Sequence, residues 1–133
     1  MSLLKSIVSG VLAAVSFFVL GILFDQLYPA RMIWFAEQYQ DMMVGNGAFF
    51  FFLSILVVGL AWGLIYPIIQ KSIPGSGWRK GVNYGLMIFF VGGIMFPVMI
   101  MGYAPLGVAV AEIVFSAIEW IVAGVVVQWV HER

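Results

Sequence analysis

The chain has 133 residues, of which 64% are hydrophobic and only 9% are charged. Soluble domains carry about 25% charged residues, so this composition excludes an ordinary soluble protein and indicates an integral membrane protein in contact with the lipid bilayer. The formal net charge is zero, so we expect no nucleic acid partner. The absence of Cys and the single His, His131, argue against metal and haem sites, and we expect no cofactor.

Four apolar segments reach the length of about 20 residues that a membrane-spanning helix needs. They cover roughly residues 4–24, 48–70, 81–103 and 106–130. The first apolar run, from Ile7 to Phe24, is longer than the core of about 7 to 15 residues in a signal peptide, so we interpret it as a retained span. The sequence therefore predicts an all-α fold, a bundle of four transmembrane helices in a single domain over residues 1–133.

The basic residues near the ends of these spans predict the orientation. Cytoplasmic loops carry the excess of Lys and Arg. Five of the six basic residues fall on one side of the predicted bundle, and only Arg31 falls on the other; the five are Lys5, Lys71, Arg79, Lys80 and Arg133. We therefore predict that both termini are cytoplasmic and that the protein lies in the cytoplasmic membrane.

The long connection between the first two spans has a helical pattern of its own. Pro29 suits the first turn of a helix, and Gly45 marks its end. Apolar residues recur between them at steps of three and four: Met32, Phe35, Ala36, Tyr39, Met42 and Met43. This predicts an amphipathic helix over about residues 29–44, lying in the outer membrane interface. It either caps the bundle, or serves as a docking surface for a larger partner or as a lid over a site.

Small residues are spaced to let the spans pack closely. Gly59 and Gly63 form a GxxxG motif in the second span, and Gly81 and Gly85 form another in the third. Helices in lipid associate chiefly through close packing at such residues, so we interpret these stripes as internal helix contacts. Pro97 predicts a kink in the third span.

The last span carries the polar residues that look most like a site. Glu112, Ser116 and Glu119 are spaced four and three residues apart, so they share one helix face. A charge near the bilayer centre costs about 2.5 to 3.5 kcal/mol on insertion scales, so this face should point inward. Ser16 of the first span comes level with Glu119, and we expect the Glu119 carboxyl to be protonated and hydrogen-bonded there.

Glu112 lies about 10 Å further out than Glu119, given the rise of about 1.5 Å per residue. Its nearest possible cation is Arg31, which also has Asp25 nearby as a possible partner in an outer ion pair. Three interpretations of the polar face stay open. It is a clamp that fixes helix register through hydrogen bonds, a contact with another subunit, or a pathway for protons or cations.

The second half of the chain resembles a known group of proteins. The residues that carry the resemblance are Lys80-Gly81-Val82-Asn83-Tyr84-Gly85-Leu86, the turn Tyr103-Ala104-Pro105-Leu106, and Gly124 near the end of the last span. They are similar to features of uncharacterised small four-span bacterial integral membrane proteins. The resemblance covers about the last 55 residues, departs at Glu119, and implies a bacterial cytoplasmic membrane protein. It supplies no activity, substrate or catalytic residue.

The function that these patterns favour is that of a structural or accessory subunit, packed in the membrane as a homo-oligomer or within a larger complex. The alternative is a small oligomeric proton-coupled transporter or channel that uses Glu119 and Glu112. We predict no enzymatic activity and no catalytic residue, because no second catalytic group, phosphate-binding loop or metal-ligand spacing accompanies the two carboxylates.

Overall fold

Every regular element in the described part of the chain is a helix, in a computed structural model that describes residues 2–133 apart from the side chains of Met42 and Met43. The elements in chain order are α1 (Leu3–Leu27), α2 (Pro29–Tyr39), the short 3-10 helix η1 (Gln40–Met43), α3 (Gly47–Ile69), α4 (Trp78–Ile88), the π-helical segment η2 (Phe89–Gly93), α5 (Met95–Ile100) and α6 (Leu106–Glu132). The all-α prediction is confirmed.

Three helices in the described residues are each long and apolar enough to cross a membrane. These are α1, α3 and α6, whose most apolar stretches have mean hydropathies of 2.6, 2.5 and 2.1. They cover the first, second and fourth predicted spans. Long apolar helices of this kind are typical of a membrane protein, because a helix satisfies its backbone hydrogen-bonding groups within its own segment.

The third predicted span, residues 81–103, is not a single α-helix. It is divided into α4, η2 and α5, of 11, 5 and 6 residues. The Ile94 amide donates to the Phe89 carbonyl at 2.7 Å, five residues back, which is the wider turn of a π-helix. Pro97 has no amide hydrogen to donate to the carbonyl of Gly93, four residues back. The chain stays helical through this region, but the regular ladder is broken.

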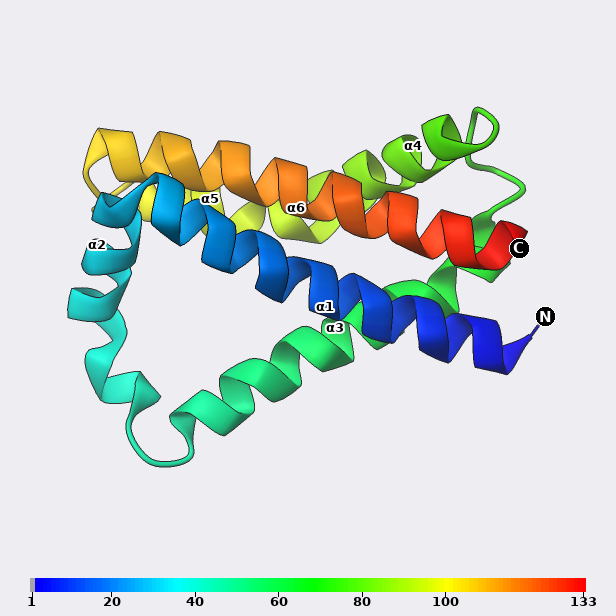
Figure 1. Cartoon of the computed structure of the whole chain (residues 1–133). Helices are drawn as coiled ribbons and strands as arrows, with labels where there is room; N and C mark the ends of the chain where they lie inside the picture. Colours follow the sequence, from blue (N-terminus) through cyan, green and yellow to red (C-terminus); the bar gives the residue numbers. More distant parts are fainter. Residues whose placement is uncertain (1) are drawn as a thin grey trace.

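The two ends of the molecule differ, as Figure 1 shows. Both termini and the connection between α3 and α4 lie together at one end, here called the termini end. The other end, here called the α2 end, has α2 lying across the ends of the longer helices. In this view α1 crosses α3, and from the crossing α3 runs away from α1 toward the α2 end.

Small residues bring α1 and α3 together at the crossing. A Cβ atom on Gly10 would lie 2.6 Å from the Leu60 Cα and 2.8 Å from the Gly59 carbonyl oxygen. A Cβ on Gly63 would overlap the Ser6 carbonyl oxygen. The backbones themselves touch, so the interpretation of the first GxxxG motif as a helix contact is confirmed.

The second GxxxG motif makes a similar contact between α4 and α6. A Cβ atom on Gly85 would lie 2.5 Å from the Trp120 carbonyl oxygen and 2.6 Å from the Ile121 Cα. A Cβ on Gly81 would lie 2.6 Å from the Val125 Cα. Gly124 faces these glycines from α6. Because the obstructing atoms belong to the backbone, no side-chain movement would make room for a methyl group here.

The first half of α3 is exposed on all sides. The side chains from Phe49 to Phe52 are between 50% and 63% exposed, and Leu53 is 39% exposed. Only 11% of the most apolar stretch of α3 is buried, against 28% for α1 and for α6. Between this half of α3 and α1 lies an open groove of about 320 Å³, lined by Val11, Ala14, Val15, Phe18, Phe49, Phe52, Leu53 and Leu56.

The helix predicted over residues 29–44 corresponds to α2 and η1. Two residues of its predicted apolar face, Phe35 and Tyr39, are half-buried and pack on a core cluster that also includes Trp34, which the predicted face did not contain. Trp34 is buried against Ile100, Val108 and Ala109, whereas Met32 is 47% exposed. A tryptophan carries a large apolar ring system, so its burial makes a large contribution to packing, and the spacing pattern alone did not single it out.

Candidate functional site

The side chain of Arg31 joins three helices at the α2 end. Pro29 opens α2 after the single linking residue Tyr28, and Arg31 follows about half a turn further along, against α1 and α6. Its Nη1 donates to Asp25 Oδ1 of α1 at 2.8 Å, and its Nε donates to Glu112 Oε2 of α6. One guanidinium therefore ties α2 to both of its neighbours through charge-assisted hydrogen bonds.

Glu112 is the most buried member of this cluster. Its side chain is 7% exposed, against 13% for Arg31 and 35% for Asp25. The Ser116 hydroxyl, one turn further along α6, donates to Glu112 Oε1 at 3.2 Å. Both carboxylate oxygens of Glu112 are thus engaged, which is what a buried charge requires. We call Asp25, Arg31, Glu112 and Ser116 the Arg31 cluster.

Aromatic rings surround the guanidinium. The Arg31 Cζ lies 5.2 Å from the centroid of the Phe35 ring and 5.7 Å from that of Phe115. Phe115 in turn stacks on Phe24 of α1, with 4.3 Å between ring centroids. Such contacts attract a cation by about 0.5 to 2 kcal/mol each, and they cover the polar groups with apolar surface.

The charges of the cluster keep Arg31 ionised. Burial by itself would lower the pKa of the Arg31 guanidinium, but the hydrogen bond to Glu112 and the negative charges of the nearby carboxylates outweigh it. The net effect is to raise the pKa of Arg31 above its ordinary value. Arg31 is therefore a permanent cation, and it forms ion pairs with both Glu112 and Asp25.

Glu119 lies outside this arrangement. It is only partly buried on α6, and no hydrogen bond between described residues includes its carboxyl. The Ser16 hydroxyl, expected as its partner, donates instead to the Ala13 carbonyl oxygen within α1 at 2.6 Å. A serine inside a helix often bonds the carbonyl three or four residues back, and the expectation overlooked this local competitor. The structure brings Glu112 and Ser116 together with Arg31 and Asp25, and leaves Glu119 and Ser16 apart.

A second polar cluster, which the sequence analysis missed, lies at the termini end. The His131 Nε2 is 3.3 Å from both the Ser9 hydroxyl and the Gly63 carbonyl oxygen, and the Lys5 ammonium donates to the His131 carbonyl at 3.5 Å. The His131 ring also packs on Tyr66, with 5.2 Å between centroids. The sequence signal for this cluster was a His at the end of the last span and a Ser near the start of the first, which both lie on the side of the termini. The contacts tie α6 to the α1–α3 crossing.

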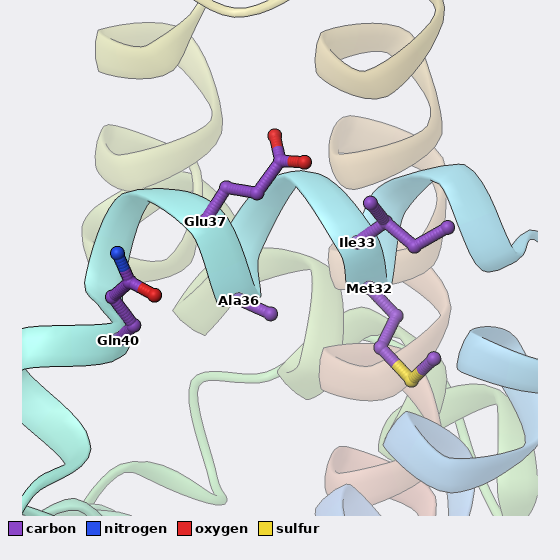
Figure 2. Close-up of a pocket in the computed structure, with 5 residues that line it drawn as sticks. All are labelled: Met32, Ile33, Ala36, Glu37 and Gln40. Carbon is purple, nitrogen blue, oxygen red and sulfur yellow. The ribbon is translucent and has the colours of Figure 1, made fainter.

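The hollows on the surface do not converge on either cluster. One, of about 320 Å³, is lined by Met32, Ile33, Ala36, Glu37 and Gln40. Figure 2 shows these side chains diverging around the α2 helix, with Glu37 on the opposite side of the ribbon from Met32 and Ala36. Convergent polar groups are typical of a ligand site, so we assign no ligand here.

The Arg31 cluster can hold helices together and can hold a charge in place. Within residues 2–133, no group of three His, Asp or Glu side chains is placed to bind a metal ion. Breaking a buried ion pair of this kind typically costs about 3 to 5 kcal/mol, because the remaining charge loses its partner. The chemistry that the geometry supports is that of an electrostatic clamp.

Comparison of the chain with models of protein families, with curated proteins and with solved structures found no significant match to any of them.

Proposed function

We propose that this chain is a small four-span membrane protein with a structural or accessory role, which packs in the bilayer against copies of itself or a larger membrane complex. The observation that supports this most directly is the exposed half of α3. Phe49 to Phe52 are at least 50% exposed on every side of a helix that diverges from its own bundle. A helix apolar all round is suited to burial among other helices in lipid.

The proposed fourth span is the combination of α4, η2 and α5. These pieces follow one another from Trp78 to Ile100 with only Ile94 between η2 and α5. That length exceeds the roughly 20 residues needed to cross the hydrocarbon core. Breaks of this kind are tolerated in membrane helices when neighbouring groups satisfy the backbone, and the Phe89 carbonyl still accepts from Ile94.

The proposed orientation has both termini in the cytoplasm and α2 in the outer interface. Five of the six basic residues lie in segments at the termini end, which supports a cytoplasmic placement for that end. The position of α2 across the helix ends supports an interfacial placement. The resemblance of the second half to small four-span bacterial proteins supports the bacterial cytoplasmic membrane as the location.

The proposal is tested by cross-linking in the membrane. A photoreactive residue replaces Phe51 on the exposed half of α3, and a matched control carries it at Val114 on α6, where exposure is similar at 48%. We expect a defined protein adduct from position 51 and weaker adducts from position 114. Adducts to lipid alone from both positions, together with a monomer in mild detergent, would refute the accessory role.

A small oligomeric proton-coupled transporter or channel is the second candidate, and Glu119 is the observation that favours it. This carboxyl shares a helix face with Glu112 and has no hydrogen bond to the described residues. The test is proton flux into liposomes that contain purified protein. Flux that is lost in Glu119→Gln, with folding and oligomeric state intact, would establish the transport role, and the absence of flux in the wild type would exclude it.

A further inference from the structure

The charged residues are distributed unequally between the two ends of the molecule. The chain has six basic and six acidic residues. Five of the basic ones lie in segments at the termini end, with Glu132 the acidic residue in those segments. We call these five residues the basic surface: Lys5, Lys71, Arg79, Lys80 and Arg133. A net positive charge at one end of a protein with zero overall charge attracts a negatively charged partner to that end.

Helix packing brings the basic residues together from separate parts of the chain. A Cβ atom on Gly81 would lie 3.2 Å from the Gln128 Cβ, so the first turn of α4 lies beside the last turns of α6. The Lys5 ammonium on α1 is 3.5 Å from the His131 carbonyl oxygen of α6. Lys71 lies two residues past the end of α3, after the C-cap residue Gln70. The basic surface is thus built from α1, the connection after α3, the start of α4 and the residue that follows α6.

None of these five cations forms an ion pair with a carboxylate among the described residues, so their charges remain available to an external anion. Both ion pairs among the described residues involve Arg31, at the opposite end. Two of the basic residues pair instead with exposed indole rings. The Arg79 Cζ lies 5.8 Å from the Trp78 ring centroid, and the Arg133 Cζ lies 4.4 Å from that of Trp129.

The two indoles locate the membrane surface. Trp78 is 64% exposed and Trp129 is 50% exposed, one at the start of α4 and the other near the end of α6. Tryptophan concentrates at the boundary between hydrocarbon and headgroups, and an Arg beside it reaches outward to the phosphate layer. The two Trp–Arg pairs lie at the same end of the α4–α6 pair, and we expect this end to stand at the level of the lipid phosphates.

We propose that the basic surface binds the headgroups of anionic phospholipids in the leaflet at the termini end. Charge complementarity selects this partner, because the basic surface meets the headgroup layer and zwitterionic lipids carry no net charge to attract it. Each basic residue near an anionic membrane surface contributes about a fivefold gain in affinity. The inference rests on the membrane-spanning arrangement and holds whether or not the chain is an accessory subunit.

The test is native mass spectrometry of the full chain in detergent, titrated with phosphatidylglycerol or with phosphatidylcholine of the same acyl chains. We expect the wild type to retain phosphatidylglycerol preferentially. The triple variant Lys71→Gln, Arg79→Gln, Lys80→Gln should lose roughly 100-fold of that preference, as three fivefold contributions imply. Raising the salt to 1 M, where the Debye length falls to about 3 Å, should weaken the wild-type preference as well.

The matched control keeps every charge: Lys71→Arg, Arg79→Lys, Lys80→Arg should retain the preference for phosphatidylglycerol. Circular dichroism of both triple variants checks that the helices are intact. Equal retention of the two lipids by the wild type would overturn the proposal, as would an unchanged preference in the Gln variant. Displacement of the lipid by millimolar inorganic phosphate would also overturn it, since the surface would then recognise a free anion.

Discussion

The two ends of the molecule are held together by different means. At the termini end, the helices meet through glycine: Gly63 of α3 contacts the Ser6 carbonyl, and Gly85 of α4 contacts the backbone of α6. At the α2 end, α3 has left the bundle, and the remaining helices are joined by the side chains of Arg31 and Trp34. Backbone contacts depend on shape alone, whereas the Arg31 cluster depends on charge.

This difference indicates which end is able to change. A glycine contact tolerates no adjustment, because the obstructing atoms lie on the main chain. The bonds from Arg31 that join α2 to α1 and α6 can be made or broken, and their loss would leave α2 held mainly by the packing of Trp34, without disturbing the α1–α3 crossing. The termini end therefore serves as the rigid part of the molecule, and the α2 end is the part that partner binding or mutation can alter.

The largest effect is expected for Arg31→Ala. This change leaves the buried Glu112 carboxylate without a cation, which typically costs about 3 to 5 kcal/mol of stability. Unfolding in a denaturing detergent titration measures the loss, and hydrogen exchange of α2 amides shows whether it is local. The exposed cation in Arg79→Ala is the control, and it should change stability by less than about 0.5 kcal/mol.

A double substitution sharpens this prediction. Replacing both partners, as in Arg31→Met with Glu112→Leu, removes the buried charge together with its counter-ion. We expect this variant to be more stable than Arg31→Ala, because an apolar pair of similar volume often matches a buried ion pair. Equal stability of the two variants would show that Arg31 acts through packing on Phe35 and Phe115 rather than through charge.

The next largest effect is expected at the termini end, for Gly85→Ala. The added methyl group would lie 2.5 Å from the Trp120 carbonyl oxygen, so α4 and α6 must separate. Overpacking of this kind typically costs about 1 to 3 kcal/mol. The matched control is Gly21→Ala in α1, where a Cβ meets no atom within 4 Å. Thermal unfolding in detergent compares the two; equal melting temperatures would contradict the contact.

The sequence was sufficient to predict features that depend on composition and spacing. Apolar runs predicted α1, α3 and α6, and the GxxxG spacing predicted the contacts at Gly59, Gly63, Gly81 and Gly85. The choice of Arg31 as the nearest cation to Glu112 followed from counting depth along the helices, and the structure places the two in contact. In each case the feature follows from the length of an apolar run or from the spacing of residues along the chain, both of which can be counted in the sequence.

Other features depend on which way a helix or a side chain points, and the sequence pattern does not indicate this. The run from Phe49 to Phe52 is apolar on every side, so no face indicates which way α3 should turn. In the π-helical segment Phe89–Gly93, Gly93 lies against the Trp120 indole, a contact between residues far apart in the chain that the sequence pattern does not reveal. The hydroxyl of Ser16 could bond either Glu119 or the carbonyl oxygen of Ala13, and the sequence does not indicate that it bonds Ala13.

A smaller effect is expected for Ser116→Ala. The variant removes the hydroxyl that donates to Glu112 Oε1 at 3.2 Å and leaves the bond from Arg31 intact. Loss of one hydrogen bond to a charged group typically costs about 1.5 to 3 kcal/mol when the group is left unsatisfied, and less here because one partner remains. Detergent unfolding should place this variant between the wild type and Arg31→Ala. A loss as large as that of Arg31→Ala would mean that the serine, not the arginine, holds Glu112.

The smallest effect concerns the hydroxyl pair at the outside of α2. Tyr39 and Tyr103 share a hydrogen bond of 3.2 Å in an exposed position. That bond, more than burial, raises the pKa of Tyr39 above its ordinary value of 10.0. A raised pKa in the folded state means that the pair stabilises the fold below pH 10, and that this contribution disappears as the pH rises through the raised pKa.

At neutral pH, Tyr39→Phe should cost less than about 0.5 kcal/mol, since both hydroxyls reach water. NMR titration of labelled tyrosine should show Tyr39 titrating at lower pH in Tyr103→Phe than in the wild type; identical titration curves would show that the two hydroxyls do not interact, leaving Arg31 and Trp34 as the residues that hold α2.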